Sequence, residues 1–405
     1  MNEHFRIAQK LGLMFLPNTT IPEDISSWAI AQLHVKSPAL GIKQVRWHSH
    51  KPKVLEWPQS LQPNLQKRDE MFWALKENME KNRRNMPGFQ TKADKNRNRQ
   101  ENLMEGLDAL KFAHRNVYGE DQLRLRLNAF WANHFRTANI FDNGNHIGHV
   151  IEEGILANLN GDFSNLLYKV TSHPAMLIYL DNTYSAGPNS IEVQRAKRNG
   201  RQAGLNDNLG RELLELHTVS PTANYTEEDI KGAAKVLAGW GAEPGRVSGD
   251  KLISLAERNK EIKKRGGTLN SWDYFKSDFA EPGNKTIMGK TFGEGKGALR
   301  KLTDFLAGHE HTIKYISFKL AQHFVSDNPT QPDLDHIESA WKSSNGNLDK
   351  IHTAVIERAI ASKEPKFQWP MTWLFQVIRL SGANGFKGWE EEQSDDYNEN
   401  IMRTN

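Results

Sequence analysis

The chain of 405 residues is long enough for one large domain or for two to three ordinary ones. Its 53 basic and 49 acidic residues leave a net charge of only +4, a balance that argues against nucleic acid as a partner. The lack of cysteine excludes disulfide scaffolds, thiolate metal sites and cysteine nucleophiles, and no run approaches the roughly 18 apolar residues of a membrane span.

Amphipathic helices dominate the first half of the chain. Helical periodicity predicts helices over residues 3–15, 20–34, 65–84, 100–118 and 162–178. Two more are predicted between 118 and 162: one begins at 121 and includes 134, and the other ends at about 159. The second helix is expected to begin with Thr20 as its cap and Pro22 in its first turn. A proline-rich connection over residues 36–63 and a polar loop over 184–204 separate the helical stretches.

Two of these helices carry histidines. On the helix that begins at Asp121, spacings of three and four place an aromatic set on one side, which we expect to be buried. That set is Leu123, Leu127, Phe130, Trp131 and His134. On the following helix His146, His149 and Glu153 share a face at a spacing that suits three metal ligands, although this spacing also arises readily by chance.

Residues 205–218 form the stretch around which the rest of the chain is organised. At about 100° per residue this helix has two arcs of different character. One arc holds Leu209, Leu213, Leu214, Leu216 and His217, and the other holds Asn208, Arg211, Glu212 and Glu215. We expect the apolar arc to be buried, so that the charged arc requires a separate explanation.

The second half continues the helical pattern after an irregular interruption. Thr226 and Asp229 form a capping box for a helix that runs to Trp240. Further helices are predicted over residues 296–307, 312–325, 331–344, 348–361 and 372–381. The predicted fold is therefore all-α, one large multi-helix domain in two parts, 1–244 and 291–405, with an irregular insertion over 245–290 that contains a short β-hairpin.

The charged arc supports two interpretations. Glu212 and Glu215, with Arg211 beside them, suit acid–base chemistry if burial raises the pKa of one carboxylate while Arg211 keeps the other ionised. The alternative is an ordinary surface ion pair between Arg211 and Glu215. Histidines in the positions of His217 and His134 are more often hydrogen-bonded core residues than ligands, but if the two helices pack together they also suit a metal or a proton relay.

Several motifs then converge on one family. The central motif is Asn206-x-Asn208-x-Gly210-Arg211-Glu212-Leu213-Leu214-Glu215-Leu216-His217-Thr218, followed by Tyr225-Thr226-Glu227-x-Asp229 and Gly239-Trp240. It is flanked by Phe130-Trp131-x-Asn133-His134-Phe135, by residues 173–182 and by Lys319-Leu320 with Phe324-Val325-x-Asp327-x-Pro329. Over nearly the whole chain this pattern resembles the bacterial domain-of-unknown-function family 1800.

The resemblance implies an all-helical bacterial protein, often exported and often encoded beside a sulfatase-like protein. It places the protein in the periplasm or envelope, whereas a chain from which no export signal has been removed would be cytoplasmic. Two departures stand out. Ala280 precedes Glu281 where members often have histidine, and Ser220 replaces a common helix-ending glycine.

The sequence therefore predicts an envelope-associated enzyme that hydrolyses or modifies a glycan or peptidoglycan-like polymer. The expected catalytic residues are Glu212, Glu215, Arg211, His217 and His134. The expected substrate-binding residues are Asn206, Asn208, Asn133, Trp131, Asp181, Asn182 and Trp240. Two alternatives stay open: a non-catalytic binding or assembly partner of a sulfatase-like protein, and an enzyme that uses a divalent metal held by histidines and carboxylates.

Overall fold

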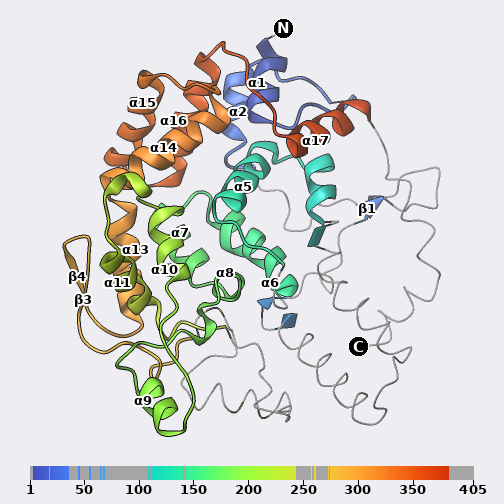
Figure 1. Ribbon diagram of the computed structural model, residues 1–405. Coiled ribbons are helices and arrows are strands. Elements are labelled where there is room, and N and C mark those ends of the chain that lie inside the picture. Colours follow the sequence, from blue (N-terminus) through green and yellow to red (C-terminus); the bar gives the residue numbers. More distant parts are fainter. Residues whose placement is uncertain are drawn as a thin grey trace, which may run out of the picture.

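The computed structural model of the chain describes residues 3–17, 19–35, 44–45, 54–55, 64–65, 67–68, 108–109, 111–139, 143–242, 257, 260, 272 and 274–382. Within these residues the protein is all-α, with short antiparallel strand pairs as its only sheets (Figure 1). The expected fold class is confirmed. The predicted helix over 65–84 and the chain beyond 382 lie outside the described residues, apart from single positions.

The first half contains helices in close succession. They are α1 Glu3–Leu11, α2 Ile25–Ala31, α5 Gln122–His134, α6 Gly144–His149, the π-helix η2 Val150–Ile155, the 3₁₀ turn η3 Leu156–Asn158, α7 Phe163–Thr171, α8 Pro174–Tyr179, η4 Asn182–Tyr184, α9 Ile191–Arg198 and α10 Asn208–Glu215. The short strands β1 Gln44–Val45 and β2 Val54–Leu55 pair within the proline-rich connection, which was not expected to contain strands.

Three predictions in this half were wrong, two because of an unrecognised helix cap and one because of a proline. Helix α2 begins after Asp24, whose carboxylate accepts hydrogen bonds from Ser26 and Ser27, so that Thr20 is not its cap. The predicted helix over 162–178 is divided before Pro174, which cannot donate a backbone hydrogen bond. The loop over 184–204 contains α9, which is capped by Ser190.

The second half follows the predicted pattern closely. Its elements are η5 Pro221–Ala223, α11 Glu227–Leu237, β3 Lys285–Ile287, β4 Lys290–Phe292, α13 Gly297–Ala307, α14 Glu310–Phe324, α15 Gln331–Ser343, α16 Leu348–Ala361 and α17 Pro370–Ser381. The Thr226–Asp229 capping box is present at the start of α11. The hairpin turns at Met288 and Gly289, both with positive φ, and β3 packs against α11.

One hydrophobic core extends from Ile7 in α1 to Ala359 in α16, and thus includes helices from both sides of the irregular stretch. Trp131, on α5, is fully buried in it. The aromatic side predicted for this helix is buried as expected. Because α10 contributes Leu209, Leu213 and Leu214 to the same core, its opposite arc is fixed in position by packing.

Candidate functional site

Helix α10 lies against α11 at a distance that only glycine permits. A Cβ atom on Gly210 would lie 2.8 Å from the backbone nitrogen of Ala234 and 2.9 Å from the carbonyl oxygen of Ile230. Both neighbours are backbone atoms, which cannot move aside as a flexible side chain would. Gly210 therefore sets the close packing of the two helices and, through it, the position of the charged arc.

Helix α10 is shorter than predicted, because its C-terminal end turns away after Glu215. The backbone N–H of His217 donates to the backbone carbonyl of Glu212, and the Thr218 hydroxyl donates to the Leu213 carbonyl at 2.6 Å. The last carbonyls of the helix are thus satisfied locally. This turn leaves Leu216 45% exposed, which corrects its placement on the buried arc. His217 is buried as expected.

Arg211 forms its main ion pair outside α10. Its two terminal nitrogens donate to the Glu227 carboxylate at 3.1 and 2.9 Å, and Asp207 lies 3.6 Å away. Among the described residues no ion pair joins Arg211 to Glu215, so the surface pair that was the alternative interpretation of the charged arc does not form. Arg211 instead ties the charged arc of α10 to the first turn of α11.

Glu212 and Glu215 are both half-buried, and neither forms an ion pair with a described residue. Burial raises the pKa of the Glu212 carboxyl, and the charge of Glu215 raises it further. Beside them, burial raises the pKa of the Tyr225 hydroxyl, as do the charge of Glu215 and the hydrogen bond to it. The arc thus offers two adjacent carboxylates, one of which holds its proton to higher pH than usual.

The two predicted histidines do meet, at the C-terminal ends of α5 and α10. Their ring centroids are 6.2 Å apart, and Nε2 of His134 lies 3.2 Å from the carbonyl oxygen of His217. Nδ1 of His134 lies 2.8 Å from Nζ of Lys319 on α14. Both ring nitrogens of His134 are therefore engaged by the protein, which leaves none free for a metal.

The other predicted metal set does not assemble. After α6 the chain passes into the π-helix η2, whose wider turn rotates Glu153 relative to the α-helical position that aligned it with His146 and His149. His149 instead contacts His173, nitrogen to nitrogen, at 3.0 Å. In the part of the chain that the structure describes, no three histidine or acidic side chains are placed to hold a metal.

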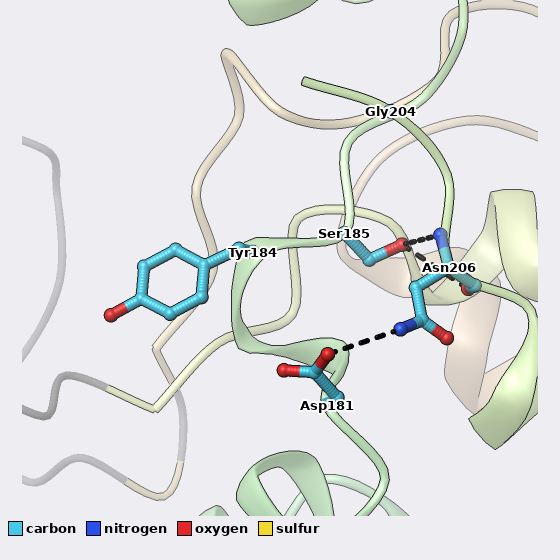
Figure 2. Close-up of a pocket in the computed structure, with 5 residues that line it drawn as sticks. All are labelled: Asp181, Tyr184, Ser185, Gly204 and Asn206. Atoms are coloured by element: carbon cyan, nitrogen blue, oxygen red, sulfur yellow. Dashed lines mark hydrogen bonds between the residues drawn. The ribbon is translucent and has the colours of Figure 1, made fainter. Parts of the chain in front are cut away.

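The predicted substrate-binding residues separate into a pocket and a structural group. An open pocket of about 300 Å³ is lined by Asp181, Tyr184, Ser185, Gly204 and Asn206 (Figure 2). The Asn206 amide faces the Asp181 carboxylate at 3.5 Å, and its backbone N–H donates to Ser185. Two of the predicted residues, Asp181 and Asn206, are thus brought together at the beginning of α10.

The structural group has other roles. Trp131 and Trp240 are fully buried, and Trp131 donates to His352 at 3.1 Å, so neither presents a ring to a ligand. The buried Asn182 donates to the Leu237 and Trp240 carbonyls and thereby fixes the end of α11. Asn133 and Asn208 are exposed, and Asn208 lies outside the pocket.

Sequence reasoning missed Lys319, Tyr225, Tyr184 and Ser185. Lys319 and Tyr225 lie within the recognised motifs, but only the tertiary structure reveals that Lys319 contacts His134 and that Tyr225 contacts Glu215. Tyr184 and Ser185 lie in a stretch read as loop, and no spacing rule connects them to Asn206. No described helix combines the length and the apolar character that crossing a bilayer would demand.

Comparison with protein-family models identifies the family to which the chain belongs. Residues 24–404 match the sequence model of a family described as protein of unknown function (DUF1800). No curated protein and no solved structure matches the chain.

Proposed function

Because the chain belongs to the DUF1800 family, whose description assigns no function, its activity has to be inferred from its site, and we propose a carboxylate-based hydrolase. The proposed substrate is a glycan or peptidoglycan-like polymer of the bacterial envelope. Glu212 acts as the general acid, and Glu215, which is bonded to Tyr225, acts as the base or as the stabilising anion.

The observation that supports this proposal is that neither Glu212 nor Glu215 forms an ion pair with a described residue. Both carboxylates are half-buried, lie one helical turn apart and repel each other. A scaffold would pair such charges reciprocally, as Arg211 and Glu227 are paired beside them. An enzyme needs one carboxyl that keeps its proton near neutral pH, which is the direction of the pKa shift at Glu212.

The pocket at the other end of α10 supports a polymer as the substrate. Its carboxylate, amide and hydroxyl groups are of the kind that binds sugar hydroxyls. Asn206 precedes the first residue of α10, and Glu212 lies four residues, or about 6 Å, into that helix. A ligand that reaches from the pocket to Glu212 has to pass along the first turn of α10, as a saccharide chain can.

The test uses peptidoglycan sacculi and a panel of soluble glycans, with release of reducing ends as the measurement. We expect Glu212→Gln to lower the rate by a factor of about 10² to 10⁴, because it removes the transferable proton. The wild-type rate should fall as pH rises through the raised pKa of Glu212, since the acid form is then lost. Glu228→Gln, which removes an exposed carboxylate paired with Lys231, is the matched control and should retain full activity.

A second candidate is a binding or assembly protein that works beside a sulfatase-like partner. It is favoured by α17, whose outer side exposes a continuous set of large apolar side chains. That set is Met371, Trp373, Leu374, Val377 and Leu380. Full biological function of both Glu212→Gln and Glu215→Gln would favour this candidate over the hydrolase. A third, a metal-dependent enzyme, has no ligand set among the described residues.

A further inference from the structure

Lys319 carries a charge that the described protein does not balance. Its ammonium group contacts Nδ1 of His134 at 2.8 Å and lies 5.1 Å from the centre of the Tyr315 ring. No described carboxylate lies within ion-pair distance of it. Burial lowers the pKa of the Lys319 amine, which reflects the cost of holding an unpaired cation there.

His134 cannot supply the missing negative charge. The carbonyl oxygen of His217 can only accept a hydrogen bond, so Nε2 of His134 carries the hydrogen and Nδ1 is the acceptor for Lys319. The ring is therefore neutral. Burial, with Lys319 and His217 as further causes, lowers the pKa of His134 well below its usual value, so it stays neutral across the physiological range.

His217 provides a second unsatisfied group at the same place. The residue is only 4% exposed, and its Nδ1 is buried without a hydrogen-bond partner. Burial and the Lys319 charge lower the pKa of His217 to about 3, so its ring is neutral and carries one hydrogen. A buried polar atom without a partner is costly, and a hydrogen bond to a bound ligand is one way to satisfy it.

We propose that Lys319 and His217 form a binding site for an oxyanion, a carboxylate, sulfate or phosphate group carried by the ligand of this protein. Lys319 supplies the positive charge, and the Nδ1–H tautomer of His217 supplies a neutral donor. His134 orients the ammonium group, and the Tyr315 ring confines it from another side. This site goes beyond the proposed hydrolysis, because anion binding requires neither Glu212 nor turnover.

A purely structural explanation for Lys319 also exists and makes different predictions. The C-terminal ends of α5 and α10 lie nearby, and a cation there would complement the partial negative charge of their last carbonyls. If that were the role of Lys319, its removal would destabilise the protein and leave the affinity for anions unchanged. If Lys319 binds a ligand, its removal should weaken anion binding without loss of stability.

The experiment titrates the full chain with sodium sulfate, sodium phosphate and sodium glucuronate by calorimetry, and the three probes distinguish a tetrahedral oxyanion from a carboxylate. We expect saturable binding of at least one probe, and an affinity about ten- to hundredfold lower in Lys319→Met, because a charge-assisted hydrogen bond is lost. Without anion, Lys319→Met should melt at or above the wild-type temperature.

Lys314→Met is the matched control, since Lys314 lies on the same helix but is exposed and paired with Glu310. It should bind as the wild type does, and so should Glu212→Gln, which separates this proposal from the hydrolase. In the wild type, the bound anion should also protect Lys319, but not Lys314, from acetylation measured by mass spectrometry. Absence of saturable binding, unchanged affinity in Lys319→Met, or equal acetylation of Lys319 with and without anion would each overturn the proposal.

Discussion

At the scale of single residues, Gly210 in the central motif and Ser220 just after Thr218 both have a special backbone geometry. Gly210 is required because α11 leaves no room for a Cβ atom. Ser220 adopts a φ of 63°, in the region that favours glycine. Its hydroxyl bonds to the backbone N–H and the side chain of Thr222, which offsets the strain of that conformation.

Gly210→Ala tests the close approach of α10 and α11. We expect the free energy of unfolding to fall by about 1–3 kcal/mol, because the added methyl group overlaps backbone atoms of Ala234 and Ile230. Urea denaturation measures the change. Gly297→Ala is the control, since a Cβ atom at this helical position meets no atom within 4 Å, and it should be neutral or stabilising. Equal behaviour of the two variants would contradict the packing argument.

At the scale of elements, α17 is unusual because its polar side chains face inward. The buried side carries Gln376 and Arg379, while large apolar side chains are exposed on the outer side. Arg379 donates to the Met14, Val117 and Gly119 carbonyls at 3.0, 2.6 and 3.0 Å. The helix is thus held by hydrogen bonds from its inner side, which leaves its apolar residues available for another role.

Substitutions on the two sides of α17 should differ strongly in their effect on the free energy of unfolding. Arg379→Met should lower the free energy of unfolding by about 3–5 kcal/mol, since it leaves three carbonyl groups buried without their charged donor. Leu374→Gln, on the exposed side, should change it by less than about 0.5 kcal/mol. Thermal and urea denaturation of both variants provide the comparison. A large loss of stability in Leu374→Gln would show that the outer side is covered within the chain.

At the scale of the whole molecule, buried neutral histidines couple stability to pH. Burial lowers the pKa of His114 to about 4 and that of His352 to about 3. His134 and His173 are shifted strongly in the same direction, again chiefly by burial, and His217 to about 3. In the unfolded chain these side chains regain their ordinary pKa near 6.5 and bind protons that the folded protein does not bind.

Stability should therefore fall as pH drops below about 6.5 and continue to fall toward the folded-state pKa values. Each buried histidine contributes up to about 1.4 kcal/mol per pH unit in this window. The urea midpoint should decrease steeply between pH 6.5 and 5. His352→Gln should reduce the slope, whereas His336→Gln, at an exposed position paired with Glu357, should leave it unchanged. A urea midpoint that stays constant between pH 6.5 and 5 would show that these histidines are not buried in their neutral form.

The sequence by itself determined the fold class and most helices of the second half. Helix α16 has the predicted bounds, and the capping box of α11 was identified residue by residue, because caps and apolar periodicity are local properties. Where prediction failed, a competing local contact decided the outcome, as Asp24 does for α2 and the Pro174 break does between α7 and α8.

Only the tertiary structure decided how the candidate site is arranged. The central motif lies on α10 and the turns beside it, and its residues separate into a carboxylate pair, a buried histidine next to Lys319 and a pocket at the opposite end. Periodicity places a side chain on a face of its own helix and says nothing about what packs there. Only the packing of other helices shows that Glu227 from α11 pairs with Arg211 and that Lys319 from α14, which has no ion pair with a described residue, contacts His134.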